Sequence, residues 1–118
     1  MLGDDDYEPP PMFEGQKWFL LDDDGEPREA PFAEVGLWFA TVGNLLLLDE
    51  VTENVRVSTV FVGCFGVRGD AMFETMVFAA EKGVTEFEGA IWRTKTRAEA
   101  VECHGSVIAR IVNELRVN

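Results

Sequence analysis

The sequence is poor in basic residues, and this shortage removes two classes of function. Ten Lys and Arg stand against 22 Asp and Glu, which gives a formal net charge of −12 over 118 residues. Contact with nucleic-acid phosphates needs clustered Lys and Arg, and an anionic membrane surface attracts the same side chains. The composition therefore argues against direct binding to nucleic acid and against binding to a membrane surface.

Cysteine and long apolar runs are also scarce. Cys64 and Cys103 are too few for a disulfide framework and match no zinc-binding spacing. Two buried, reduced thiols are favoured over a disulfide between them, and the sequence leaves both alternatives open. The most apolar stretch, residues 35–48, is too short to span a bilayer, and residues 1–11 lack the basic and apolar regions of a secretory signal. These features predict a cytoplasmic protein.

The length suits one domain. Residues 1–15 are acidic and proline-rich without periodicity, so we predict a mobile N-terminal tail followed by a single domain over residues 16–118. Residues 1–40 hold eleven acidic and two basic side chains, which concentrates the negative charge in the N-terminal third.

The N-terminal half predicts a hairpin followed by a short helix. A strand over residues 16–22 and a second strand ending at Arg28 flank a turn at residues 22–25. Pro31 suits the first position of a helix that Gly43-Asn44 ends. Four apolar side chains at helical spacing should be buried: Val35, Trp38, Phe39 and Val42.

The remainder predicts strands and a long final helix. The predicted strands are residues 45–50, 55–65, 71–79 and 90–92, with a turn at 66–70 and a charged loop at 81–88. Thr96 and Glu99 fit a capping box at the start of the helix. Its predicted buried side comprises Val101, His104, Val107, Ile108, Ile111, Val112 and Leu115. Together the elements predict an α+β fold: a small antiparallel sheet with a short N-terminal helix and a longer C-terminal helix packed on one face.

No residue pattern indicates a metal, a cofactor or a catalytic residue. Aligning Gly25 with the sixth position of a calcium loop places Leu20 and Pro31 where the first and twelfth ligands belong. His104 is the one histidine, but Cys103 beside it points about 100° away on a helix. An enzyme would therefore need Cys64 or Glu74 to approach His104 from the sheet. A structural histidine at the edge of the core is favoured.

Two groups of charged side chains have more than one interpretation. Arg93, Lys95 and Arg97 either balance the acidic third of the chain or meet an anionic partner. The acidic third either solubilises the chain or meets a basic groove of a partner protein, where charge complementarity gives fast, salt-sensitive binding. On the second interpretation, the partner-binding residues are Asp22, Asp23, Asp24, Glu26 and Glu29.

Three features carry a resemblance to a known family. They are the segment VRVSTVFVG at residues 55–63, the segment FETMVF at residues 73–78, and His104 in the last helix. In these features the chain resembles a widespread family of small phage and prophage proteins. Family members usually carry an Asp-His pair after the first segment, whereas Phe65 and Gly66 stand here. The resemblance implies a phage or prophage gene product made in the host cytoplasm during infection or lysogeny.

These observations predict a non-enzymatic phage accessory protein that binds and inhibits a host protein complex. The partner would be a basic or nucleic-acid-handling host protein, and the sharpest version is an anti-CRISPR or anti-restriction protein that mimics nucleic acid. The alternative is a minor virion structural or assembly protein, which would self-associate through an exposed strand edge. The sequence leaves the oligomeric state open.

Overall fold

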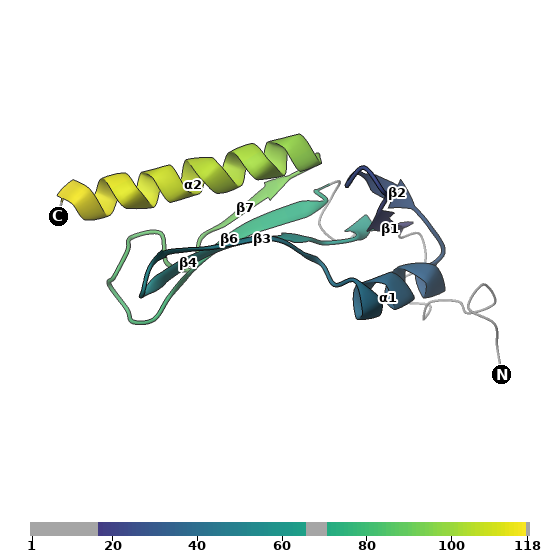
Figure 1. Ribbon diagram of the computed structural model, residues 1–118, viewed down its shortest axis with the longest axis horizontal. Coiled ribbons are helices and arrows are strands. Elements are labelled where there is room, and N and C mark those ends of the chain that lie inside the picture. Colours follow the sequence, from purple (N-terminus) through teal and green to yellow (C-terminus); the bar gives the residue numbers. More distant parts are fainter. Residues whose placement is uncertain (1–16, 66–70, 118) are drawn as a thin grey trace.

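A computed structural model describes residues 17–65 and 71–117. Over these residues the chain forms two antiparallel sheets, a short helix and a long C-terminal helix (Figure 1). The predicted α+β class is confirmed, with the strands divided between two sheets. The predicted tail at residues 1–15 and the predicted turn at residues 66–70 lie outside the described residues.

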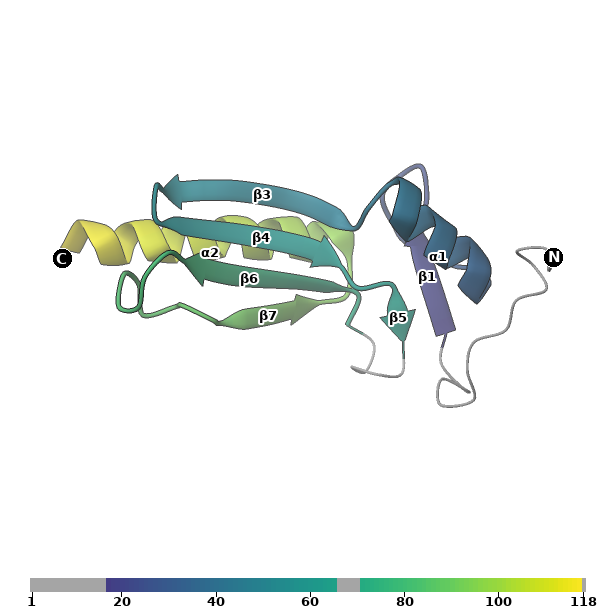
Figure 2. The same ribbon diagram turned by 90° about the horizontal axis from the view of Figure 1, so that it is seen from below.

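The larger sheet has four strands, one face of which is covered by the C-terminal helix. The strand order is β3 (Leu45–Thr52), β4 (Val55–Phe61), β6 (Phe73–Ala79) and β7 (Ile91–Thr94). Helix α2 (Arg97–Val117) lies along one face of this sheet, as both views show (Figures 1 and 2). Strands β4 and β6 are the two central strands of this sheet.

Alternation along the strands separates the two faces of this sheet. Val57 pairs with Val77 and Thr59 pairs with Thr75, and all four side chains are buried on the α2 side. The aliphatic core there consists of Val55, Val57, Val77, Val107 and Ile111. Val101 and Val112 of α2 were predicted to be buried, and this is wrong: both side chains are exposed. A single sheet covers only a narrow stripe of a straight helix, so apolar residues at the edges of that stripe stay in water.

The capping box predicted for α2 is confirmed. The backbone N–H of Glu99 donates to Thr96 Oγ1 at 3.1 Å, and the Thr96 N–H donates to Glu99 Oε1 at 3.0 Å. The hydrogen bond that the Thr96 backbone N–H donates to the Glu99 carboxylate, followed by those from the Thr96 side chain and the Lys95 backbone, holds the pKa of Glu99 below its ordinary value. No helix within the described ranges is long and apolar enough to cross a membrane.

The smaller sheet has the order β2 (Pro27–Glu29), β1 (Lys17–Leu21), β5 (Cys64–Phe65), and α1 (Phe32–Thr41) packs against β1. The sequence predicted one strand over residues 55–65, and this is wrong because the chain leaves the larger sheet after Phe61. Figure 2 shows β5 turned away from the line of β4 and lying beside β1.

Gly63 explains where the chain changes sheets. Its φ of +76° is a conformation that residues with a side chain rarely adopt. A Cβ at this position would also lie 2.5 Å from the ring of Phe39. Glycine therefore permits both the bend and the close approach of α1.

An aromatic cluster joins the two sheets. Phe61 and Phe73 are fully buried, and the Phe61 ring centroid lies 5.8 Å from that of Trp38 and 6.1 Å from that of Phe39. Val42, predicted to share the buried face of α1, is instead exposed. The helix ends at Thr41, so Val42 takes the C-cap position and its side chain points into solvent.

Candidate functional site

The acidic turn between β1 and β2 is held by one of its own carboxylates. Asp22 Oδ1 accepts hydrogen bonds from the backbone N–H of Asp24 at 2.9 Å and of Glu26 at 3.0 Å. Gly25 supplies the positive φ, +80°, that the turn needs. Asp22 therefore shapes the turn, and its Oδ1 is already engaged.

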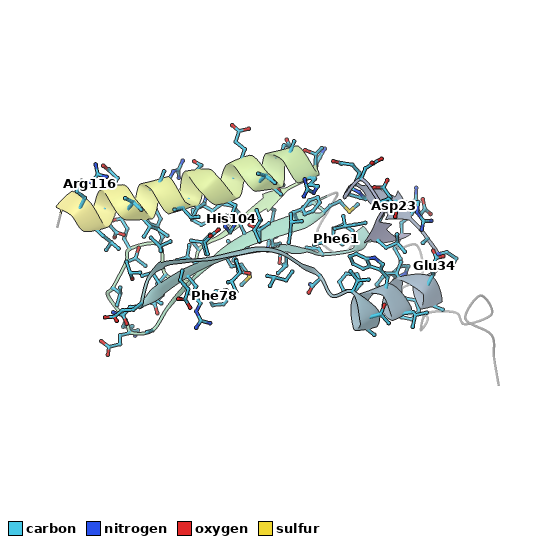
Figure 3. All side chains as sticks on the ribbon, viewed as in Figure 1. Asp23, Glu34, Phe61, Phe78, His104 and Arg116 are labelled. Atoms are coloured by element: carbon cyan, nitrogen blue, oxygen red, sulfur yellow. The ribbon has the colours of Figure 1, made fainter. Side chains whose placement is uncertain are left out.

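The other four predicted partner-binding residues present their carboxylates to solvent. Asp23, Asp24, Glu26 and Glu29 are all exposed. Within residues 17–65 and 71–117, none of these four makes an ion pair. Asp23 lies at the opposite end of the molecule from Arg116 (Figure 3). The fold thus gathers four exposed carboxylates on one hairpin.

Helix α1 places apolar side chains beside these carboxylates. Leu37 and Val42 are exposed and Trp38 is half-buried. One groove, lined among others by Arg28, Leu37 and Trp38, runs between the hairpin and α1. A second hollow, lined by Trp38 and Val42, lies between the turn and the start of α2. We call Asp23, Asp24, Glu26, Glu29, Leu37, Trp38 and Val42 the hairpin surface.

The basic side chains do not form one patch. Arg56 pairs with Glu50 at 3.4 Å, and Arg93 Nε donates to Glu74 Oε2 at 3.0 Å. Arg97 lies against the acidic turn, since a Cβ on Gly25 would come within 2.5 Å of its Nε. Of the two interpretations of these side chains, balance of the acidic third therefore fits the position of Arg97, whereas Arg93 pairs with Glu74 of the larger sheet.

His104 belongs to a chain of polar side chains between α2 and the sheet. Its Nε2 donates to Asp49 Oδ2 at 2.7 Å, and its Nδ1 lies 2.8 Å from Thr59 Oγ1. Thr59 Oγ1 lies 2.7 Å from Thr75 Oγ1. In the neutral ring, Nδ1 accepts the Thr59 proton and the Thr59 oxygen accepts from Thr75, so every polar atom in the buried part has a partner.

The order of these groups, carboxylate then imidazole then hydroxyl, is that of a hydrolase triad. A nucleophile must reach its substrate, however, and Thr59 is 0% exposed and His104 is 3% exposed. The arrangement is therefore a hydrogen-bond network that joins α2 to β3, β4 and β6 and in which every buried polar atom has a partner. It fits the structural role that the sequence favoured for His104.

The sequence missed the partners of His104. Glu74 was one proposed partner, and this is wrong because its carboxylate pairs with Arg93 on the other face of the sheet. Cys103 carries a free thiol, while the side chain of Cys64 is outside the described part. A signal was present, because Thr59 continues the buried alternation of Val55 and Val57.

The described ranges hold no group of three or more metal-ligating side chains. Comparison with known protein families, with curated proteins and with solved structures finds no match for this chain. The hairpin surface is accordingly the candidate functional site, on the strength of its own geometry.

Proposed function

We propose that this chain is a non-enzymatic protein that binds and inhibits a partner protein through the hairpin surface. The observation that carries the proposal is the cluster of four exposed carboxylates on the β1–β2 hairpin, none of which makes an ion pair within residues 17–65 and 71–117. Arg97 is one basic side chain beside these four acids, and a partner with a basic groove would neutralise the remaining negative charge. Electrostatic complementarity of this kind raises the association rate and suppresses wrong partners.

The apolar side chains of α1 favour a protein partner. Specific protein interfaces combine an apolar, aromatic-rich centre with a polar rim. Leu37, Trp38 and Val42 supply such a centre, and the hairpin carboxylates lie beside it. A nucleic acid would be repelled by the same carboxylates.

The resemblance to phage and prophage proteins supports the biological setting of the proposal. A phage product made inside the host gains from blocking the complexes that recognise foreign nucleic acid. The grooves of such complexes are lined by Lys and Arg, for which carboxylates can stand in for phosphates. The proposed targets are therefore host CRISPR or restriction complexes.

The test is a pull-down from host lysate, with and without nuclease, by the wild-type chain and two variants. The first variant neutralises the hairpin: Asp23→Asn, Asp24→Asn, Glu26→Gln and Glu29→Gln. The second makes the same change in net charge at exposed acids elsewhere: Glu53→Gln, Glu81→Gln, Glu88→Gln and Glu102→Gln.

We expect the wild type and the second variant to retain a basic nucleic-acid-handling protein after nuclease, and salt to release it. The hairpin variant should lose that protein. Equal retention by both variants would refute the proposal, because the hairpin carboxylates would then contribute no more to binding than exposed acids elsewhere.

A second candidate function is a minor virion structural or assembly protein. The observation in its favour is that β3, eight residues long, forms an open edge of the larger sheet. Recovery of the chain in purified virions, without a host partner in the pull-down, would select this function.

A further inference from the structure

The face of the larger sheet opposite α2 carries an apolar surface that no described element covers. Four side chains on three strands are between 42% and 57% exposed: Leu45, Leu48, Phe78 and Ile91. Val60, Met76 and Ser58 lie between them in the strand register. Figure 3 shows Phe78 on the opposite side of the sheet from His104. We call these seven residues the open face.

We propose that the open face packs against the open face of a second copy of this chain. The charge distribution favours a second copy of the chain as the partner of the open face. Among the described residues, the charged side chains bordering the open face are the pairs Glu50 with Arg56 and Glu74 with Arg93, together with Glu53, which lines a hollow beside Phe78. Three acids and two bases bring this face close to neutrality, while the whole chain carries −12. It is thus a surface on which two such acidic chains can meet with little net negative charge between them.

The register gives the symmetry of the pair. Leu48, Ser58, Met76 and Ile91 stand opposite one another and form one row straight across all four strands. A two-fold axis along this row lays each strand over its own counterpart, running in the opposite direction. Leu48 then meets Leu48, and Ile91 meets Ile91. Two twisted sheets pack in this way with their strands about 30° apart.

The positions of the acidic hairpin and of α1 favour the two-fold axis along this row over an axis parallel to the strands. The axis across the strands sends the two hairpin surfaces to opposite ends of the dimer, where their charges are farthest apart. Helix α1 lies beyond the end of β3, on the side of the sheet away from α2 (Figure 1). An axis parallel to the strands would bring the two α1 helices together.

The size of the open face suits a specific but modest interface. The four strands have 8, 7, 7 and 4 residues. At about 3.3 Å per residue and about 4.8 Å between strands they cover a flat area of about 410 Å² per copy. The two copies together cover about 820 Å², a little below the roughly 1,000 Å² of specific interfaces, before the relief of the side chains is counted. We therefore expect a dimer that dissociates on dilution.

The test is sedimentation of the full chain over a wide range of concentration. One variant carries Leu48→Lys and Ile91→Lys, which brings lysines together across the axis. The matched control carries Val101→Lys and Val112→Lys, two similarly exposed apolar residues on α2. Both variants lower the net negative charge equally, so general repulsion cannot separate them. Thermal melting checks that both are folded.

We expect the wild type and the α2 control to form a dimer and the open-face variant to be monomeric. High salt should strengthen the wild-type dimer, because it screens the repulsion between two acidic chains. A monomeric wild type at every concentration, or a dimeric open-face variant, would overturn the proposal. Dissociation in high salt would do the same, since it indicates contact through charged groups. Partner binding by the hairpin surface uses other residues, and we expect salt to weaken it.

Discussion

The two regions of the molecule differ in how they use their polar groups. In the region formed by α2 and the larger sheet, the acidic side chains that pack between the elements have partners within the chain, while other acids there, such as Glu53 and Glu81, are exposed. Asp49 binds His104, Glu74 binds Arg93, and Glu114 accepts hydrogen bonds from Thr85 and from the backbone of the 81–88 loop. In the region formed by α1 and the smaller sheet, four carboxylates on one hairpin have no ionic partner within the described ranges.

The two helices also differ in length, in capping and in burial. Helix α2 has 21 residues, a complete capping box and a buried histidine. Helix α1 has ten residues, its N-cap is Pro31, whose ring offers no acceptor, and Val35 is its buried residue. Regions with less burial open more readily and are the usual location of binding surfaces. The comparison locates most of the buried aliphatic core in the α2 region, while the surface proposed to bind a partner lies in the α1 region.

The largest expected effect comes from breaking the contact between the two regions. Phe61 is fully buried and its ring lies against Trp38 of α1 and Phe73 of the larger sheet. We expect Phe61→Ala to lower the free energy of unfolding by roughly 3–5 kcal/mol, because it removes buried area and leaves a cavity. Chemical denaturation measures this loss, and a shift in tryptophan fluorescence should report the loosened Trp38.

Phe78→Ala is the matched control for this change. The same side chain is removed, but Phe78 is 50% exposed on the open face. We expect it to cost at most about a third as much, since far less area returns to water. Equal losses for the two variants would mean that the aromatic cluster does not join the regions.

The next largest effect concerns the hydrogen-bond network of His104 between α2 and the larger sheet. His104→Ala should destabilise the chain by roughly 2–4 kcal/mol, because it leaves a cavity and removes the partner of the buried Thr59 hydroxyl. Asp49→Ala should cost only about 1 kcal/mol, because the Asp49 side chain is 57% exposed and water can replace it at His104 Nε2. Denaturation of both variants gives the comparison.

The order of these two losses is the critical result. If Asp49→Ala cost as much as His104→Ala, the hydrogen bond between Asp49 and His104, rather than the burial of His104, would hold α2 to the sheet. Partner binding through the hairpin surface should be unchanged in the Asp49 variant, since β3 contributes nothing to that surface. If the Asp49 variant lost its partner, the separation of stability and partner binding between the two regions would be wrong.

Local signals in the sequence predicted the α2 region well. The alternation in β6 and the Thr96–Glu99 spacing each depend on neighbours within a few residues, and both are confirmed. The buried faces of both helices were predicted too wide, because Val42, Val101 and Val112 are exposed. Helical spacing indicates which side faces inward, but the width of the buried stripe depends on the element packed against it.

The features that the sequence did not predict depend on contacts between segments that are far apart in the chain. The break after Phe61 occurs because Phe39 of α1 packs over Gly63, and nothing within residues 55–65 reveals Phe39. The pairing of His104 with Asp49 joins residues 55 positions apart. For the candidate site, the sequence identified the acidic hairpin residues, but only the turn geometry separates Asp22 from the other four.

The difference between Asp22 and the four exposed acids of the hairpin leads to the smallest predicted effect. Asp22→Ala should cost about 1 kcal/mol of stability, because Asp22 Oδ1 caps two backbone N–H groups of the turn. Asp23→Ala, one residue away and with an exposed carboxylate, should change stability by less than about 0.5 kcal/mol. Both variants lose one negative charge, so a difference in denaturation midpoint reports turn geometry alone. If the two midpoints coincide, Asp22 does not stabilise the turn, and if Asp22→Ala alone also weakens capture of the partner, Asp22 is a binding residue like its neighbours.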